Sequence, residues 1–513
     1  MSTRTLAAER DSYRNIVSSS SLIGGAQVVR LLAGAGAAKV AALALGPAGV
    51  GTLAYYQSIV DLAVTISGFG VASGAVRAIA DADARADARK VHRTALALKR
   101  ALAVSGALGG LVVAASSHRI TSVLSGQSGG PPSGTALLGV AVAFTVMTAG
   151  MAATMQGLRR IRQLAWHQVV SAVTTLLVGS ACYVSVGANG IVPAIAISSL
   201  IAFATANRLL QERGVTSTER VSWSATANDA ATLLAQGSVF LWNAVLAAAA
   251  AVLTRVWIID TLGGVDNGLY QAAWALSGAF ASFVLQAMAA DFYPRAAALA
   301  DSPADLNRLA NEQTEAGVLL ALPGLVATIV LAPFVIALFY AESFRAASDL
   351  LPWLIVGVFG RAVSWPLAYI LLARRAYVLY GVSETVTTLT GVGLTWVCMV
   401  LMGIEGVAVA FAAQYALYLA GSRILAGHVA TFSWSRRAVA AMLGASAALL
   451  LALTLRRIEG AAGTLLGVTL TASVSAACAH QLARRLGSDH WLRNVASLTQ
   501  ARLGSVWAIL IRR

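Results

Sequence analysis

The sequence predicts an all-α protein that crosses a membrane many times, and two observations lead to this fold class. Of its 513 residues, 58% are hydrophobic and only 12% are charged, whereas about a quarter of the residues in an average soluble domain are charged. Apolar runs of about 20 residues, the length that crosses a bilayer core of about 30 Å, recur from one end of the chain to the other. An ordinary soluble enzyme is therefore excluded.

Fourteen apolar runs, separated by polar breaks, are each long enough to form a transmembrane helix, so we expect about 14 such helices, with 12 as the lower limit. The first run is too long for a secretory signal, so we expect it to stay in the protein as a helix. The predicted segments are 17–45, 51–77, 99–117, 135–157, 168–187, 190–210, 231–255, 268–290, 316–340, 349–372, 377–401, 404–426, 437–455 and 461–482.

The charges indicate the orientation of these helices. The chain has 37 Lys and Arg against 22 Asp and Glu, a net charge of +15, and basic residues concentrate in cytoplasmic loops. If the N-terminus is cytoplasmic, the inside loops hold nearly all of the loop arginines and lysines and the outside loops are almost bare. We therefore expect a multi-pass membrane protein with both termini in the cytoplasm. The inside clusters lie at 85–100, 159–162, 208–220, 295–308, 374–375, 436–437 and in the basic tail.

An internal repeat predicts two lobes. Lys39, the turn Leu45-Gly46-Pro47 and the pair Tyr56-Gln57 resemble Arg255, Leu262-Gly263-Gly264 and Tyr270-Gln271 at nearly the same spacing. Six helices separate the copies, so both have the same orientation in the membrane. The expected parts are an N-terminal six-helix lobe, a C-terminal six-helix lobe, two additional transmembrane helices and an amphipathic cytoplasmic tail, at 1–220, 221–430, 431–485 and 486–513.

Motifs of soluble enzyme chemistry are missing from the sequence. It has no Walker A pattern, and its six histidines lie no closer than ten residues apart, so no pair has the spacing of zinc ligands. The three cysteines fall in separate apolar runs. We expect no enzyme activity, no metal, no cofactor and no nucleic-acid partner. A membrane glycan polymerase or ligase is disfavoured because no loop is long enough for an outside catalytic domain.

Charged residues inside the apolar runs are the candidate functional residues, since each costs about 2.5–3.5 kcal/mol at the bilayer centre. Arg30 lies roughly 21 Å into the first segment, and Asp61 lies roughly 24 Å from the cytoplasmic end of the second. The two could form a static ion pair or a pair that opens to take an anion or a proton. Arg361 is also deep, Lys39 and Arg255 occupy matching places nearer the outer face, and Glu384 is intermediate.

Together these groups leave a surplus of about two positive charges, which favours an anionic guest. Gln57 shares a helix face with Asp61, and Gln271 shares one with Trp274. Such faces form either helix contacts or a hydrated wall suited to a sugar. The predicted substrate-binding residues are Arg30, Lys39, Arg255, Arg361, Gln57 and Gln271. Asp61 and Glu384 are the candidates for coupling or gating, with proton or sodium coupling left open.

The N-terminal motifs resemble a known family. The stretch 20–27, Lys39, the run 45–51, Tyr56-Gln57-Ser58 and Gly68-Phe69-Gly70 are similar to the opening of Wzx-type polysaccharide flippases. These are O-antigen and enterobacterial common antigen translocases of the multidrug/oligosaccharidyl-lipid/polysaccharide exporter (MOP) superfamily. The specific likeness covers about the first 80 residues, and over the rest it depends on helix count and the two-lobe pattern.

The resemblance implies two six-helix lobes around a central cavity that work by alternating access. It also implies a substrate, an oligosaccharide repeat unit on undecaprenyl diphosphate, which is flipped to the outer leaflet of the bacterial inner membrane for O-antigen or related surface polysaccharide synthesis. Candidate partners are membrane lipids, a polysaccharide polymerase and chain-length machinery. Many such flippases have twelve helices, and the two extra helices here are similar to those of lipid II flippases. A lipid II flippase and a cation-coupled multidrug exporter therefore stay open as alternatives.

Overall fold

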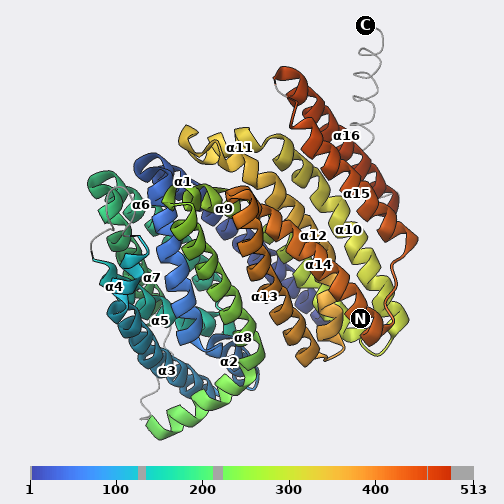
Figure 1. Ribbon diagram of the computed structural model, residues 1–513. Helices are drawn as coiled ribbons and strands as arrows, with labels where there is room; N and C mark the ends of the chain where they lie inside the picture. Colours follow the sequence, from blue (N-terminus) through green and yellow to red (C-terminus); the bar gives the residue numbers. More distant parts are fainter. Residues whose placement is uncertain (1–2, 125–133, 212–222, 459, 487–513) are drawn as a thin grey trace. The chain divides into compact units, whose positions relative to one another are not determined.

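The computed structural model describes residues 3–124, 134–211, 223–458 and 460–486, and it describes their side chains except within 3–24, 71–73, 223–240, 280–291 and at 486. All the regular elements in these ranges are helices (Figure 1). The predicted all-α class is therefore confirmed. Apart from its first residue, the predicted amphipathic tail 486–513 lies outside the described residues.

The chain divides into two compact units. The first holds the chain up to Gly268 together with Phe339–Ala341, and the second holds Leu269–Leu338 and the residues from Glu342 onward. The helices of the first unit are α1 (Thr3–Gly68), α2 (Val71–Ala84), α3 (Ala88–Ala115), α4 (Ser117–Ser122), η1 (Thr135–Leu137), α5 (Leu138–Gly157), α6 (Ile161–Val186), η2 (Gly187–Gly190), α7 (Ile191–Gln211) and α8 (Trp223–Thr261).

Helix α9 begins in the first unit and continues into the second. The helices of the second unit are α9 (Gly264–Ala298), α10 (Pro303–Val330), α11 (Ala332–Phe339), η3 (Glu342–Phe344), α12 (Ala347–Ala373), α13 (Tyr377–Met402), α14 (Ile404–Ala430), α15 (Arg436–Leu455) and α16 (Ala461–Leu486). Helix α12 is the centre of this unit, because α10, α13, α14 and α15 all pack against it. Its buried residues Leu367, Ile370 and Leu371 join Phe292 and Ala426 in one hydrophobic core.

Eleven stretches of the described helices are long and apolar enough to cross a membrane. Two of them, 25–68 with 44 residues and 161–211 with 51 residues, are about twice the length of one crossing. Each contains a break: Gly46 has φ 64° and ψ −175° and is followed by Pro47, and Gly187 has φ 62°. These breaks fall between the predicted pairs of segments. Each predicted transmembrane segment overlaps a helix, and the polytopic class is confirmed.

The helices differ from the predicted segments at several ends. The segment 51–77 is interrupted at Phe69 and Gly70, which have φ values of 47° and 64°, so α1 ends and α2 begins there. The segment 316–340 is interrupted at Leu331, between α10 and α11. Hydropathy records which residues suit the bilayer, and it does not record backbone geometry. Helices therefore extend into polar stretches and break inside apolar ones.

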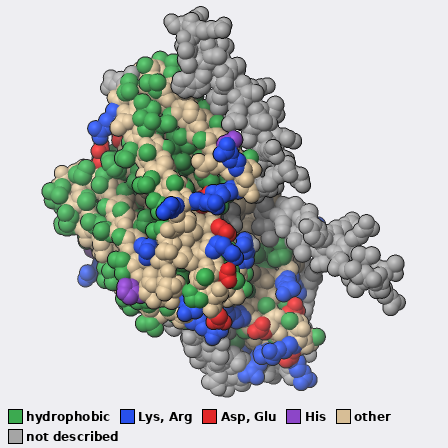
Figure 2. Space-filling view, turned by 90° about the vertical axis from the view of Figure 1, so that its right-hand side faces the viewer, with side chains coloured by type: hydrophobic (Ala, Val, Ile, Leu, Met, Phe, Trp, Pro, Cys, Tyr) green, Lys and Arg blue, Asp and Glu red, His purple; other side chains and the backbone are tan. Residues whose placement is uncertain are grey.

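The surface of the described residues suits a lipid environment. Large hydrophobic side chains are exposed on helices of both units, among them Val184 at 74%, Val378 at 79% and Leu401 at 77%. Figure 2 shows broad areas of hydrophobic side chains, with charged side chains gathered in limited regions of the face in view. Soluble proteins rarely expose apolar patches of this extent. The chain is a multi-pass membrane protein.

The two copies of the internal repeat share two local features. Gly46 and Gly263 both have positive φ, 64° and 103°, at a junction between two helices. Tyr56 and Tyr270, the matching aromatic residues, are both buried, with 0% and 6% exposure. Helix α8, which the repeat places in the second lobe, packs against α1, α2 and α3 in the first unit. The predicted lobes 1–220 and 221–430 stay a prediction.

Candidate functional site

The first unit contains Asp61 and Arg255 within electrostatic range of each other. Asp61 lies in the second half of α1 and Arg255 lies in α8, and the Arg255 charge acts on the Asp61 carboxylate. Arg255 is almost fully buried, with 7% exposure, and its Nη1 donates to the carbonyl oxygen of Ala251 at 3.3 Å. A buried guanidinium whose charge reaches a carboxylate on a neighbouring helix is a candidate functional charge within the membrane.

Arg30 does not pair with Asp61 in this structure. Among the described residues no ion pair within 4 Å joins them, and the Arg30 side chain is exposed. Similar depth in two neighbouring segments was the reason for expecting this pair. Depth does not fix which side of a helix a residue occupies. It therefore could not predict that the charge acting on Asp61 is that of Arg255 and not that of Arg30.

Lys39 is held by the backbone at the end of α11. Its Nζ donates a hydrogen bond to the carbonyl oxygen of Tyr340, and both residues belong to the first unit. Tyr340 is buried, with 4% exposure, and burial raises the pKa of its hydroxyl to about 12. The ammonium group of Lys39 therefore links α1 to a segment 301 residues further along the chain.

Gln57 lines a polar cavity inside the first unit. The cavity has a volume of about 230 Å³ and lies among α1, α5, α6 and α7. The Gln57 side chain is exposed to it and makes no hydrogen bond with another described residue. Hydroxyl groups supply the other polar lining, and all of them are neutral. Those residues are Thr145, Thr175, Tyr183, Ser198 and Ser199.

The second unit brings Arg361 and Glu384 to one group of aromatic rings. The guanidinium carbon of Arg361, on α12, lies 5.9 Å from the ring centre of Tyr415 on α14. The Tyr418 hydroxyl, one turn further along α14, donates a hydrogen bond to Glu384 on α13. The rings of Tyr415 and Tyr418 are 6.0 Å apart and nearly perpendicular. Three helices thus position a cation, a carboxylate and two phenol rings together.

These rings belong to a longer aromatic track in the second unit. From α9 to α14, neighbouring ring centres lie 5.7 Å, 5.1 Å, 4.9 Å and 6.0 Å apart, in the order Tyr270, Trp274, Phe411, Tyr415 and Tyr418. Gln271, another predicted site residue, is half-buried at the start of this track on α9. The sequence analysis missed the α14 rings, although 411, 415 and 418 have the spacing of one helix face.

The arrangement in each unit can bind an anion that carries polar groups. Within the described ranges, no group of three His, Cys, Asp or Glu side chains lies close enough to hold a metal ion. Guanidinium groups bind phosphate oxygens, and aromatic faces with adjacent hydroxyl and amide groups suit a sugar ring.

Comparisons with solved structures define the fold class. An inward-facing multidrug resistance MATE transporter of the MOP superfamily matches with a TM-score of 0.62 at 15% identity, covering 79% of this chain and 96% of that one. The lipid II flippase MurJ, in an inward closed conformation, matches with a TM-score of 0.64 at 11% identity, covering 92% and 99%. A MOP superfamily transporter from Pyrococcus furiosus matches with a TM-score of 0.53 at 15% identity, covering 81% and 96%. The chain has the fold of these membrane transporters.

The family follows from the sequence itself. The model of the polysaccharide biosynthesis protein family matches residues 41–349, more than half of the chain. The chain belongs to this family. Among curated proteins, no sequence matches it. The family and the fold agree with the resemblance that the N-terminal motifs indicated.

Proposed function

We propose that the protein flips undecaprenyl-diphosphate-linked oligosaccharide repeat units across the bacterial inner membrane by alternating access, for O-antigen or related surface polysaccharide synthesis. The observation that carries the proposal is the Arg361 guanidinium 5.9 Å from the Tyr415 ring, on an aromatic track of the second unit. A diphosphate requires cations and a sugar requires stacking surfaces with hydrogen-bonding groups. Membership of the polysaccharide biosynthesis protein family supports a glycan substrate.

The candidate residues have three expected roles. Arg361 and Arg255 would contact the diphosphate or an acidic sugar, with Arg30 and Lys39 as further cations. Gln57, in the 230 Å³ cavity of neutral hydroxyl groups, would contact sugar hydroxyls, and Gln271 would do so beside Tyr270. The carboxylates Asp61 and Glu384 would couple transport to a proton or sodium gradient or gate the substrate.

The experiment is a leaflet-exchange assay in liposomes. The purified full chain would be reconstituted with a fluorescent undecaprenyl-diphosphate oligosaccharide, and a membrane-impermeant reagent would report the fraction in the outer leaflet. We expect exchange with the wild-type chain and none in protein-free liposomes. A pH gradient or a sodium gradient imposed in parallel would identify the coupling ion.

The same assay distinguishes the alternatives. Exchange of lipid II at a higher rate than other lipid-linked glycans would make the protein a lipid II flippase. Uptake of a cationic dye without any exchange of lipid-linked glycan would make it a multidrug exporter. A new covalent product formed from the labelled substrate would contradict transport and would indicate a glycan polymerase or ligase.

A further inference from the structure

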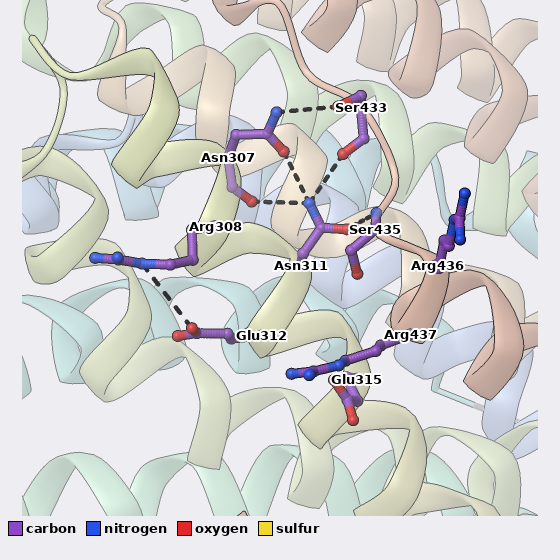
Figure 3. A pocket seen from close by; sticks show the side chains of 9 residues that line it. All are labelled: Asn307, Arg308, Asn311, Glu312, Glu315, Ser433, Ser435, Arg436 and Arg437. Carbon is purple, nitrogen blue, oxygen red and sulfur yellow. Dashed lines mark hydrogen bonds and ion pairs between the residues drawn. The ribbon is translucent and has the colours of Figure 1, made fainter.

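A polar pocket of the second unit has no role in the proposed transport step. It lies between the N-terminal half of α10 and the segment that joins α14 to α15, and its volume is about 500 Å³ (Figure 3). Every residue that lines it has a polar or charged side chain, three of them arginines. A cavity of this size can hold a phosphate group together with part of a larger headgroup.

Asn311 fixes the geometry of one wall. Its side chain, which is buried with 7% exposure, donates from Nδ2 to the carbonyl oxygen of Ser433 at 2.9 Å. Its Oδ1 accepts a hydrogen bond from the backbone N–H of Ser435 at 2.7 Å. Ser435 then caps α15 by accepting from the backbone N–H of Ala438 at 3.1 Å. The start of α15 is therefore held in place before any ligand binds.

The acidic groups of the pocket already have cationic partners. Glu312 lies 4.0 Å from Arg308, which also pairs with Asp305 at 3.0 Å, and Glu315 accepts from Arg485 of α16 at 2.8 Å. Arg436 and Arg437 form no ion pair with another described residue. Figure 3 shows both arginines on the α15 side of the pocket.

The position of these two arginines is unfavourable unless an anion is present. They are the first two residues of α15, and the N-terminus of a helix already carries a partial positive charge. Cations there lower the stability of the helix by mutual repulsion, whereas an anion is stabilised by the helix and by both guanidinium groups. The pocket is thus suited to phosphate oxygens.

The surroundings indicate that the phosphate belongs to a lipid. Along α15, Leu443 and Leu450 are 65% and 62% exposed, so the helix surface that leads away from the pocket is apolar. The distribution of Lys and Arg predicts that this end of the unit lies at the cytoplasmic surface, where anionic lipids are abundant. We propose that the pocket binds the phosphate headgroup of an anionic phospholipid of the cytoplasmic leaflet.

The test compares lipids and variants without a transport assay, so its outcome is independent of the proposed function. Phosphatidylglycerol, phosphatidylcholine or inorganic phosphate would be titrated into the purified full chain in detergent. The Tm and the number of lipids retained in native mass spectrometry would be measured. We expect phosphatidylglycerol to raise the Tm and to be retained. The R436Q/R437Q variant should bind it about 10- to 30-fold more weakly.

The matched control is R89Q/R375Q, which removes two exposed basic charges elsewhere on the same predicted side. Equal retention of phosphatidylglycerol by R436Q/R437Q and the control would overturn the proposal. A Tm increase with inorganic phosphate as large as that with phosphatidylglycerol would overturn the assignment to a lipid. Where the glutamine variant does not fold, R436K/R437K keeps both charges but loses bidentate contacts. Wild-type affinity in that variant would overturn bidentate binding of the phosphate by the two guanidinium groups.

Discussion

The side-chain amide of Asn267 donates a hydrogen bond of 2.7 Å to the backbone carbonyl of Gly51, a residue 216 positions earlier in the chain. Asn267 is completely buried and Gly51 is buried as well. The two residues belong to the two copies of the internal repeat, just after Gly46 and Gly263, the junction glycines. The hydrogen bond therefore joins the repeat copies at their equivalent junctions.

Replacing Asn267 with Ala should destabilise the fold, because it leaves the buried carbonyl of Gly51 without its donor. Such a loss costs about 1–3 kcal/mol. The Tm of the purified chain in detergent should fall. Gln156→Ala is the control, since the Gln156 side chain is exposed and forms no hydrogen bond with another described residue. A Tm equal to that of the control would show that the hydrogen bond contributes nothing measurable.

Gly268→Ala tests the close approach of the same two segments. A Cβ at Gly268 would lie 1.9 Å from the carbonyl oxygen of Pro47, which leaves no room for a methyl group. We expect a lower Tm and a lower yield of folded protein. Gly278→Ala, on the same helix, meets nothing within 4 Å and should raise the Tm slightly, because Ala favours a helix by about 0.5–1 kcal/mol over Gly. A higher Tm for Gly268→Ala than for Gly278→Ala would contradict the close approach of Gly268 to Pro47.

Much of the helical architecture could be predicted because hydropathy and helix length are both set by the bilayer. The break at Phe69 and the end of α10 at Leu331 could not be predicted, since apolar residues continue through both points. At the candidate site, Arg361 and Glu384 could be predicted because each is a charged residue within an apolar run. Their partners on α14 are Tyr415 for Arg361 and Tyr418 for Glu384. These contacts depend on how the helices rotate against each other, and a hydropathy pattern does not contain this information.

Arg361→Ala should lower the exchange of lipid-linked oligosaccharide at least tenfold while the protein still inserts in the membrane. The substitution removes the guanidinium that lies over the Tyr415 ring and would contact the diphosphate. Tyr415→Phe keeps the ring and should retain most of the activity. Surface glycan export in cells and leaflet exchange in liposomes are the measurements.

Arg423→Ala is the matched control for Arg361. Arg423 also lies over an aromatic ring, with its guanidinium carbon 5.5 Å from the ring centre of Phe432, near the end of α14. Its loss should leave transport largely unchanged. Wild-type glycan export in Arg361→Ala, or an equal defect in both variants, would rule out a specific role for Arg361.

Glu384→Gln separates structure from coupling at the second carboxylate. The amide oxygen of Gln can still accept the hydrogen bond from the Tyr418 hydroxyl, so the Tm should change little. The side chain can no longer carry a negative charge or release a proton. We expect leaflet exchange that no longer responds to an imposed pH or sodium gradient. A response equal to that of the wild type would show that Glu384 has no part in coupling. The control is Glu384→Ala, which also loses the hydrogen bond and should lower the Tm.

A double-mutant cycle identifies the electrostatic partner of Asp61. Asp61→Asn, Arg255→Gln and the double variant form one cycle, and Arg30→Gln replaces Arg255→Gln in the other. The structure places the field of Arg255 on Asp61 and gives no ion pair between Asp61 and Arg30. Residues that interact show coupling energies of about 0.5–3 kcal/mol, whereas distant residues are additive within about 0.5 kcal/mol. Chemical unfolding in detergent should therefore show coupling with Arg255 and additivity with Arg30, and the reverse result would restore the pairing that helix depth alone suggested.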